Sequence, residues 1–315
     1  MISVVIPVYN EEQNLPPLMD RLETALAGLE GGEPYEIILT DDGSADRSLE
    51  IMKGFAAARP GVRVVELVRN YGQHAAVFAG LAQARGEIVV TLDADLQNPP
   101  EEIPKIVAAF REGYDLVNTI REGRQDTFFR RYASRLTNAM VRKFSGITLS
   151  DFGCMLRGYH RNVVAPMVER KEYRTFIPAL AMLHARRPTE VPVQHSARER
   201  GASNYSLLKL FSLQLDLVTS FSMAPLRMLI ILGWGVALLG IGFGALLMVL
   251  RFVFGAEWAA NGVFTLFAIL FFFVGAQFLA FGLLGEYIGR IYQEVRNRPT
   301  YLLRDEEPGD RTGER

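Results

Sequence analysis

The sequence predicts an α/β fold with a mostly parallel sheet, followed by a pair of long apolar helices. In about the first 120 residues, short β-branched and apolar runs alternate with helical patterns, which is typical of βαβ units. Further along the 315-residue chain, two long segments carry no charged residue. Acidic residues follow three of the expected strands. These observations indicate one large α/β domain and a separate apolar module.

The expected strands and helices alternate along the chain. The strands are expected at Ser3–Pro7, Glu36–Thr40, Val62–Leu67, Glu87–Leu92 and Leu116–Thr119. The helices are expected at Glu11–Leu29, Asp46–Arg59, Gln73–Ala84 and Pro100–Glu112. Strands separated by helices form a mostly parallel sheet, whose ligands bind at the carboxyl ends of the strands. The residues that follow each strand are therefore candidates for a functional site.

The two apolar runs are long enough to cross a membrane. No charge occurs in the 23 residues between Arg227 and Arg251 or in the 28 residues between Glu257 and Glu286. At a rise of ~1.5 Å per residue, each run can span a hydrocarbon core of roughly 30 Å. We expect a transmembrane hairpin with spans at about 228–250 and 263–285. A pair of buried core helices is the alternative.

Basic residues flank this hairpin, whereas the loop between the runs holds one charge of each sign. The basic residues are Arg198, Arg200, Lys209 and Arg227 before it, and Arg290, Arg296, Arg298 and Arg304 after it. The positive-inside bias therefore puts both termini and the α/β domain in the cytosol. We expect a cytosolic domain at 1–206, a juxtamembrane interfacial helix at 207–226, the transmembrane helices at 227–286 and a cytosolic tail at 287–315.

A further interfacial helix is expected at 127–144. This stretch mixes aromatic with basic residues, which is typical of a helix on an anionic membrane surface. A solvated basic helix packed on the domain is the alternative.

Charge and cysteine content exclude several classes of protein. The 34 Lys and Arg residues against 35 Asp and Glu residues give a formal net charge of -1, so the chain has no overall electrostatic footprint for nucleic acid. The single cysteine, Cys154, cannot form an internal disulfide, which suits a reducing compartment. The run Met1–Pro7 resembles a first strand and lacks the basic leader of a signal peptide.

Acidic groups from three strands are expected at one edge of the sheet. Glu11 follows the first strand, Asp41 and Asp42 the second, and Asp93 and Asp95 the fourth. Carboxylates two residues apart at a strand end can share one hard cation, and Mg²⁺ or Mn²⁺ prefers such oxygen ligands. A metal held there would act as a Lewis acid on a diphosphate leaving group. The alternative is a turn in which the aspartates only cap the next helix.

Several strings at these strand ends resemble a known family, the inverting GT-A glycosyltransferases of family 2. The strings are Val5–Glu11, Asp41–Ser44, Arg69–Gly72 and Asp93–Glu101. More narrowly, the chain resembles the polyprenyl-phosphate glycosyltransferases, the group that contains dolichyl-phosphate mannose synthases. Within that group it is most similar to the undecaprenyl-phosphate 4-deoxy-4-formamido-L-arabinose transferases. The strings for this likeness are Asn70–His74, Arg124–Asp126, Asp151–Arg157 and Arg174–Pro178.

The resemblance implies a role for each matching residue. The implied donor contacts are Pro7, Tyr9, Glu11, Asp42, Asp93, Asp95, Arg121, Arg198, Arg200 and Ser203. The implied metal ligands, for Mg²⁺ or Mn²⁺, are Asp95 and Gln97. The implied acceptor-phosphate contacts are Arg124, Arg174 and Asp151, and the implied catalytic residues are Asp151, Asp95 and Arg200. A phosphate monoester has a second pKa near ~6, so Asp151 has two open roles, as a base or as a group that orients an acceptor dianion.

The implied activity is inverting transfer of a sugar from a nucleotide diphosphate, expected to be UDP, to a polyprenyl phosphate. In a bacterium the acceptor would be undecaprenyl phosphate at the cytosolic face of the inner membrane, for lipid A or cell-envelope glycan modification. The expected partners are the nucleotide-sugar donor, the polyprenyl phosphate and the lipid bilayer, with no nucleic acid. The oligomeric state stays open between a monomer and a homo-oligomer.

Four alternatives are weighed against this implied glycosyltransferase. One is a GDP-mannose-dependent polyprenyl-phosphate mannose synthase. A processive polysaccharide synthase would carry a Gln-x-x-Arg-Trp string and more spans, and this sequence contains neither. A non-catalytic donor- or lipid-binding membrane protein would not need the acidic strand ends. A channel would need an ionisable pore residue, whereas the apolar runs offer only Gln277 as an obvious interior polar group.

Overall fold

The computed structural model describes residues 1–29, 32–121, 151, 154–169, 177–194, 224–254, 263–295, 299 and 301–304. The chain divides into two compact units. The first comprises Met1–Ser206 together with Pro299–Arg315, and the second comprises Leu207–Arg298. The expected helix at 127–144 lies outside the described residues, as does most of the expected helix at 207–226.

The first unit contains a mixed, mostly parallel sheet of seven strands in the order β3-β2-β1-β4-β6-β5-β7. The strands are β1 (Ile2–Val8), β2 (Tyr35–Asp41), β3 (Val62–Glu66), β4 (Ile88–Thr91), β5 (Leu116–Arg121), β6 (Arg157–His160) and β7 (Pro188–Val193). Among these strands, β6 alone runs antiparallel to its neighbours β4 and β5. The structure confirms the five strands expected from the sequence and adds β6 and β7.

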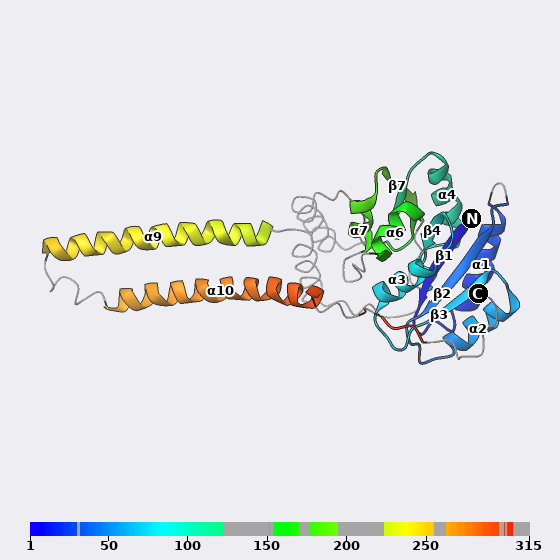
Figure 1. Ribbon diagram of the computed structural model, residues 1–315, viewed down its shortest axis with the longest axis horizontal. Coiled ribbons are helices and arrows are strands. Elements are labelled where there is room, and N and C mark those ends of the chain that lie inside the picture. The colour runs from blue at the N-terminus through cyan, green and yellow to red at the C-terminus, as the bar shows by residue number, and fades with distance from the viewer. Residues whose placement is uncertain are drawn as a thin grey trace. The chain divides into compact units, whose positions relative to one another are not determined.

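Helices cover both faces of this sheet (Figure 1). They are α1 (Leu15–Ala27), α2 (Ser48–Ala58), α3 (Gln73–Gln83), the 3₁₀ turn η1 (Pro100–Glu102), α4 (Ile103–Arg111), α6 (Arg161–Glu169) and α7 (Ile177–His184). The four expected helices are confirmed, with α1 starting later than expected and η1 forming the first turn of the fourth.

Side chains alternate between the two faces along each strand and so form two apolar clusters. In β1, Val4 and Ile6 face the cluster that α1 and α4 close, whereas Val5 faces the cluster that α3, α6 and α7 close. On α1, the fully buried residues recur at helical spacing, at Leu15, Leu18, Met19 and Leu22. Each fully buried Leu contributes about 1.5–3 kcal/mol relative to an exposed one. This packing fixes the strand ends that carry the candidate site.

The chain returns to the first unit after the apolar helices. Leu303 forms an antiparallel bridge with Leu67, the residue that follows β3. We call the described segment Tyr301–Arg304 the C-terminal strap. The strap pairs next to the outermost strand of the sheet, a contact that the sequence pattern did not predict.

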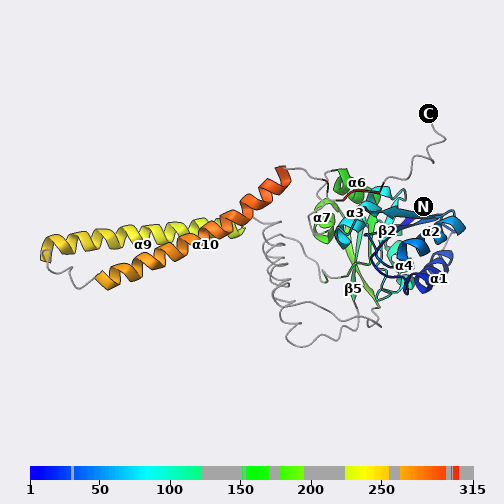
Figure 2. The same cartoon turned by 90° about the horizontal axis from the view of Figure 1, so that it is seen from below.

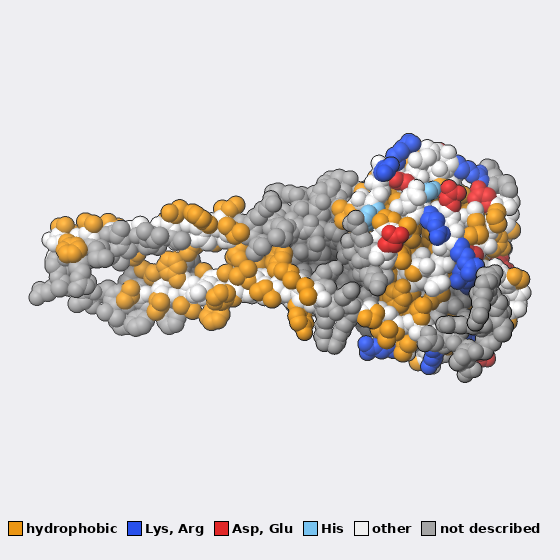
Figure 3. Space-filling model, viewed as in Figure 1, with side chains coloured by type: hydrophobic (Ala, Val, Ile, Leu, Met, Phe, Trp, Pro, Cys, Tyr) orange, Lys and Arg blue, Asp and Glu red, His pale blue; other side chains and the backbone are white. Residues whose placement is uncertain are grey.

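The second unit contains α9 (Ala224–Phe254) and α10 (Val263–Val295), which contact each other (Figures 1 and 2). Both helices coincide with the expected apolar runs, and many of their described apolar side chains are exposed (Figure 3). Within the residues that the structure describes, no helix meets the length and apolarity required to cross a membrane. The transmembrane hairpin therefore stays a prediction.

Candidate active site

The structure gathers the predicted acidic residues at one edge of the sheet. Glu11 lies beyond β1, Asp42 beyond β2, and Asp93 and Asp95 beyond β4, while Arg121 ends β5. The charges of Asp95, Glu11 and Arg121 all act on the carboxyl of Asp93. Residues from β1, β4 and β5 are thus brought together at the carboxyl ends of their strands, where α/β sheets bind ligands.

Asp93 combines a short hydrogen bond with a raised pKa. Its Oδ1 accepts a hydrogen bond from Gln73 Nε2 at 2.7 Å, and its Oδ2 accepts a long one from Asn98 Nδ2 at 3.5 Å. Burial raises the pKa of Asp93 to about 7, and the charge of Asp95 acts in the same direction. A cation bound between the two carboxylates would remove their repulsion, so this pair fits a divalent metal ion.

Asp95 and Gln97 face each other across a tight turn. The Gln97 side chain donates from Nε2 to Asp95 Oδ2 at 2.6 Å, and the Gln97 backbone N–H donates to Asp95 Oδ1 at 3.2 Å. Leu96 between them has a φ of 60°, a left-handed conformation that costs a non-glycine residue roughly 1–3 kcal/mol. Within the described part of the chain, no three His, Cys, Asp or Glu residues form a complete metal site. One or two carboxylates and an amide oxygen suit Mg²⁺, which takes its remaining ligands from water and substrate phosphates.

Asp42 is buried and holds a loop in place. Its Oδ1 accepts a hydrogen bond from the Tyr71 amide at 2.7 Å, and its Oδ2 accepts one from the Gly72 amide at 2.9 Å. Burial raises the pKa of Asp42. The neighbouring Gly43 has a φ of 71°, and a Cβ there would lie 2.6 Å from Asn70 N. The structure therefore shows Asp42 as an anchor for the loop at 69–72, and its implied role in base recognition stays a prediction.

The segment after β1 is tied to the residues that follow β2. The Asn10 amide donates to Ser44 Oγ at 3.1 Å, and the Glu11 amide donates to Ser48 Oγ at 2.8 Å. Tyr9, between these anchors and β1, has 49% of its surface exposed. Its ring is therefore accessible to a ligand, and its implied place beside the nucleoside stays a prediction.

Arg121 forms a bidentate ion pair with Asp151. Arg121 Nε donates to Asp151 Oδ2 at 2.6 Å, and Nη2 donates to Oδ1 at 2.8 Å. The side chains are 16% and 7% exposed, so the pair is shielded from bulk water. A predicted donor residue and a predicted acceptor residue are thus joined directly.

Arg157 holds the backbone of Asp151. No role for this residue was expected from the sequence. Its Nη2 donates to the Asp151 carbonyl and its Nε to the Cys154 carbonyl, both at 2.8 Å, while Nη1 donates to Asn118 Oδ1. Arg157 is 1% exposed, and burial lowers its pKa. All three acceptors are neutral oxygens, which satisfy the hydrogen-bond donors of Arg157 without cancelling its charge. The Arg157 guanidinium therefore places a buried positive charge next to Asp151. A buried cation without hydrogen bonds would be very costly.

The remaining predicted residues fall into two groups. Pro7 is buried within β1, where it pairs with Thr40 of β2. The other predicted residues lie outside the described part of the chain, namely Arg124, Arg174, Arg198, Arg200 and Ser203. Their roles stay predictions.

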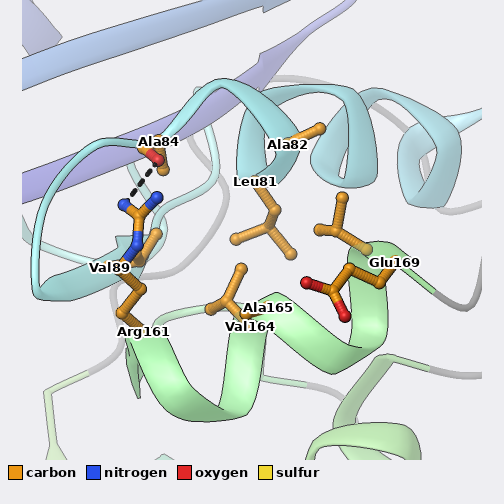
Figure 4. Close-up of a pocket in the computed structure, with 9 residues that line it drawn as sticks. Leu81, Ala82, Ala84, Val89, Arg161, Val164, Ala165 and Glu169 are labelled. Atoms are coloured by element: carbon orange, nitrogen blue, oxygen red, sulfur yellow. Dashed lines mark hydrogen bonds between the residues drawn. The ribbon is translucent and has the colours of Figure 1, made fainter.

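A cavity of about 180 Å³ opens between α3 and α6, away from this edge (Figure 4). Leu81 and Ala84 line it from the C-terminal end of α3, and Arg161 Nη1 donates to the Ala84 carbonyl at 3.2 Å. Helix α3 begins with Gln73, which contacts Asp93, and its other end reaches the cavity. The cavity therefore lies at the far end of the sheet from the acidic residues.

Comparison with known proteins decides the family. The sequence model of glycosyl transferase family 2 matches residues 3–166. The chain belongs to glycosyl transferase family 2. The resemblance inferred from the strand-end strings is confirmed, and the chain is a glycosyltransferase.

Two relatives of this glycosyltransferase carry the same name, undecaprenyl-phosphate 4-deoxy-4-formamido-L-arabinose transferase. The protein from Edwardsiella ictaluri is 55% identical over 306 residues, which cover 96% of this chain and 93% of the relative. The protein from Shewanella sediminis is 53% identical over 313 residues, which cover 99% of this chain and 94% of the relative.

A solved structure shares the fold. It is glucosyl-3-phosphoglycerate synthase from Mycobacterium tuberculosis, in complex with Mn²⁺, UDP and phosphoglyceric acid. Its TM-score is 0.50 at 24% identity, with 69% of this chain and 76% of that chain covered. This likeness supports a GT-A-like α/β fold for the first unit.

Proposed function

We propose that this glycosyltransferase transfers 4-deoxy-4-formamido-L-arabinose from a UDP-linked donor to undecaprenyl phosphate for lipid A modification. The relatives that carry this sugar and this acceptor in their names align over nearly the whole chain. The observation that carries the proposal is the convergence of Glu11, Asp93, Asp95 and Arg121 at one sheet edge. An acidic edge with an adjacent arginine suits a nucleotide diphosphate bound through a divalent metal.

The donor side of the site has a defined division of labour. When bound, a divalent cation such as Mg²⁺ or Mn²⁺ supplies Lewis-acid stabilisation to the departing diphosphate. Asp95 and the amide oxygen of Gln97 would hold it, with Asp93 next to them. Tyr9 offers its exposed ring to the nucleoside. Arg198, Arg200 and Ser203 are proposed to close over the diphosphate, because arginine's planar fork matches phosphate oxygens.

The acceptor side is built around Asp151. A phosphate monoester is largely a dianion at neutral pH, because its second pKa is near ~6. We therefore assign Asp151 to orienting the acceptor, together with Arg124 and Arg174. Arg121 connects the two sides, since it pairs with Asp151 and its charge lowers the pKa of Asp93. In-line attack by a phosphate oxygen, opposite the departing UDP, would invert the anomeric carbon.

The membrane part of the proposal rests on the second unit. A polyprenyl tail lies in the bilayer, so an enzyme that anchors itself there meets the acceptor phosphate at the interface. The charge-free runs and the exposed apolar side chains of α9 and α10 support such an anchor. We propose the boundaries 1–206, 207–226, 227–286 and 287–315 for the domain, the interfacial helix, the hairpin and the tail. The domain and both termini are assigned to the cytosolic face of the inner membrane.

A transfer assay tests the proposal. Full-length protein in bilayers that contain undecaprenyl phosphate is given the UDP-linked donor and Mg²⁺, and the glycosylated lipid is quantified. We expect Asp95→Asn to lose roughly 100-fold or more in rate, because it removes one stabiliser of the leaving-group charge. Asp20→Asn, on the exposed face of α1, is the matched control and should keep the wild-type rate. Full turnover by Asp95→Asn, or by the wild type in excess chelator, would overturn the metal-dependent mechanism.

A further inference from the structure

The C-terminal strap is bonded to the chain that leaves β3. The Val68 amide donates to the Leu302 carbonyl at 2.9 Å, and the Arg304 amide donates to the Glu66 carbonyl at 2.8 Å. Together with the bridge described above, these bonds make the strap a short antiparallel partner of β3, which is the last strand of the sheet on this side. Residues from beyond the apolar helices therefore belong to the same unit as the candidate active site.

Side chains reinforce this pairing. The Arg304 guanidinium forms an ion pair with Glu66, and Lys53 Nζ lies 3.0 Å from the same carboxylate. Burial acts to raise the pKa of Glu66, yet the hydrogen bonds from Arg304 and Lys53 hold it below its ordinary value. Tyr301 packs against the apolar cluster under α3. Backbone, charge and apolar contacts thus all hold the strap in place.

The strap holds the beginning of a loop whose end is held by Asp42. The loop at 67–72 follows β3 directly, and the Tyr71 and Gly72 amides donate to the Asp42 carboxylate. Only Arg69 and Asn70 lie between these amides and the strap-bound Val68, and both residues pass close to Gly43. A shift of Val68 at the strap-bound end of the loop would therefore displace the Tyr71 and Gly72 amides that bond to Asp42.

We propose that the C-terminal strap is a positioning element for the donor site, which fixes the loop at 67–72 against Asp42. Donor affinity would then depend on the chain that follows the apolar helices. The inference rests on the proposed UDP-donor function. Without the strap, the loop must become ordered when the donor binds, and that entropic cost weakens binding. A purely structural strap that only covers the edge of β3 would change stability and leave the affinity of the folded protein unaltered.

Two deletions in the full-length protein separate these roles. Removal of residues 299–315 takes away the strap, whereas removal of residues 305–315 leaves it and serves as the matched control. UDP binding is measured by titration calorimetry in Mg²⁺, with the dissociation constant and the binding stoichiometry determined separately. We expect the longer deletion to raise the dissociation constant by about tenfold, a usual size for coupling between sites, and the shorter one to leave it unchanged.

Substitutions at Arg304 test the same contact without a deletion. Arg304→Ala removes the ion pair with Glu66 and keeps the backbone donor, whereas Arg304→Pro removes both. We expect the dissociation constant for UDP to rise in that order, and Arg111→Ala, which breaks an exposed ion pair with Glu33, to leave it unchanged. The inference would be overturned if the strap variants show a lower binding stoichiometry or a lower melting temperature while their dissociation constant for UDP is unaltered. Absence of UDP binding to the wild type would instead overturn the proposed function itself.

Discussion

Asp151→Asn is the substitution that separates acceptor positioning from donor binding. The asparagine keeps the shape of the side chain and removes its charge. In the native structure both Asp151 oxygens accept from Arg121, at 2.6 and 2.8 Å, and the side chain is 7% exposed. After the substitution an amide NH₂ group faces the Arg121 guanidinium. Arg121, whose charge also acts on Asp93, then lacks the carboxylate partner that it has in the native structure.

The stability cost follows from this geometry. Removing one partner of a buried ion pair costs about 3–5 kcal/mol. Because Arg121 is partly exposed and the asparagine oxygen still accepts one bond, we expect about 2 kcal/mol. For a domain of this size that corresponds to a fall of about 4–8 °C in melting temperature. If Asp151 orients the acceptor as proposed, the activity should fall much further, by roughly 100-fold in kcat, because the acceptor phosphate would lose its orienting group.

Calorimetry and kinetics together decide the role of Asp151. UDP affinity should change by less than about threefold, or ~0.7 kcal/mol. Over the same comparison, kcat on membrane-embedded acceptor should fall by roughly 100-fold. Glu101→Gln is the matched control, because Glu101 forms a bidentate pair with Arg21 that is exposed and worth little. A large loss of UDP affinity in Asp151→Asn would assign the residue to the donor site, and a retained kcat would refute the positioning role.

Four further variants test other contacts. In the metal-free protein Asp93 has a folded pKa of about 7, above its unfolded value. The folded state therefore holds the extra proton, and this contribution to stability is lost as pH rises through about 7. Asp93→Asn should flatten that part of the melting-temperature profile. Arg157→Lys should lower kcat while UDP affinity is kept, because one ammonium cannot reach three acceptors in different directions. Gly158→Ala should cost about 1–3 kcal/mol in thermal denaturation, since its Cβ would overlap side chains of α4. Gly54→Ala, with open space around it on α2, should stabilise the protein by about 0.5–1 kcal/mol.

The fold was predictable where local patterns carry it. The first five strands are short, β-branched apolar runs, which in β1 and β2 are buried almost throughout. The helices between them bury residues at helical spacing, as Leu18 and Leu22 do. The antiparallel strand β6 was not predictable, because Arg157–His160 contains a buried arginine and a glycine whose places are set by β4 and β5. The strap was not predictable either, since it pairs with a strand more than two hundred residues earlier, and no local signal encodes that contact.

The candidate site was predictable in part for a similar reason. Parallel strands bring their carboxyl ends together, so the sequence alone places Glu11, Asp93 and Asp95 at one edge of the sheet. The partners of these residues could not be predicted, because Gln73 reaches Asp93 from the start of α3 and Arg157 reaches Asp151 from within the sheet. Such contacts depend on tertiary packing and leave no spacing in the sequence.

The most direct test of the central claim is mass spectrometry of the lipid product. Full-length protein in bilayers that contain undecaprenyl phosphate is offered UDP-4-deoxy-4-formamido-L-arabinose, UDP-glucose, UDP-N-acetylglucosamine and GDP-mannose in parallel, each with Mg²⁺. We predict a single new lipid whose mass is that of undecaprenyl phosphate carrying 4-deoxy-4-formamido-L-arabinose, formed from the first donor. A product formed preferentially from GDP-mannose or from a UDP-hexose would contradict the proposed donor. No glycosylated lipid from any of the four donors would contradict the proposed transfer.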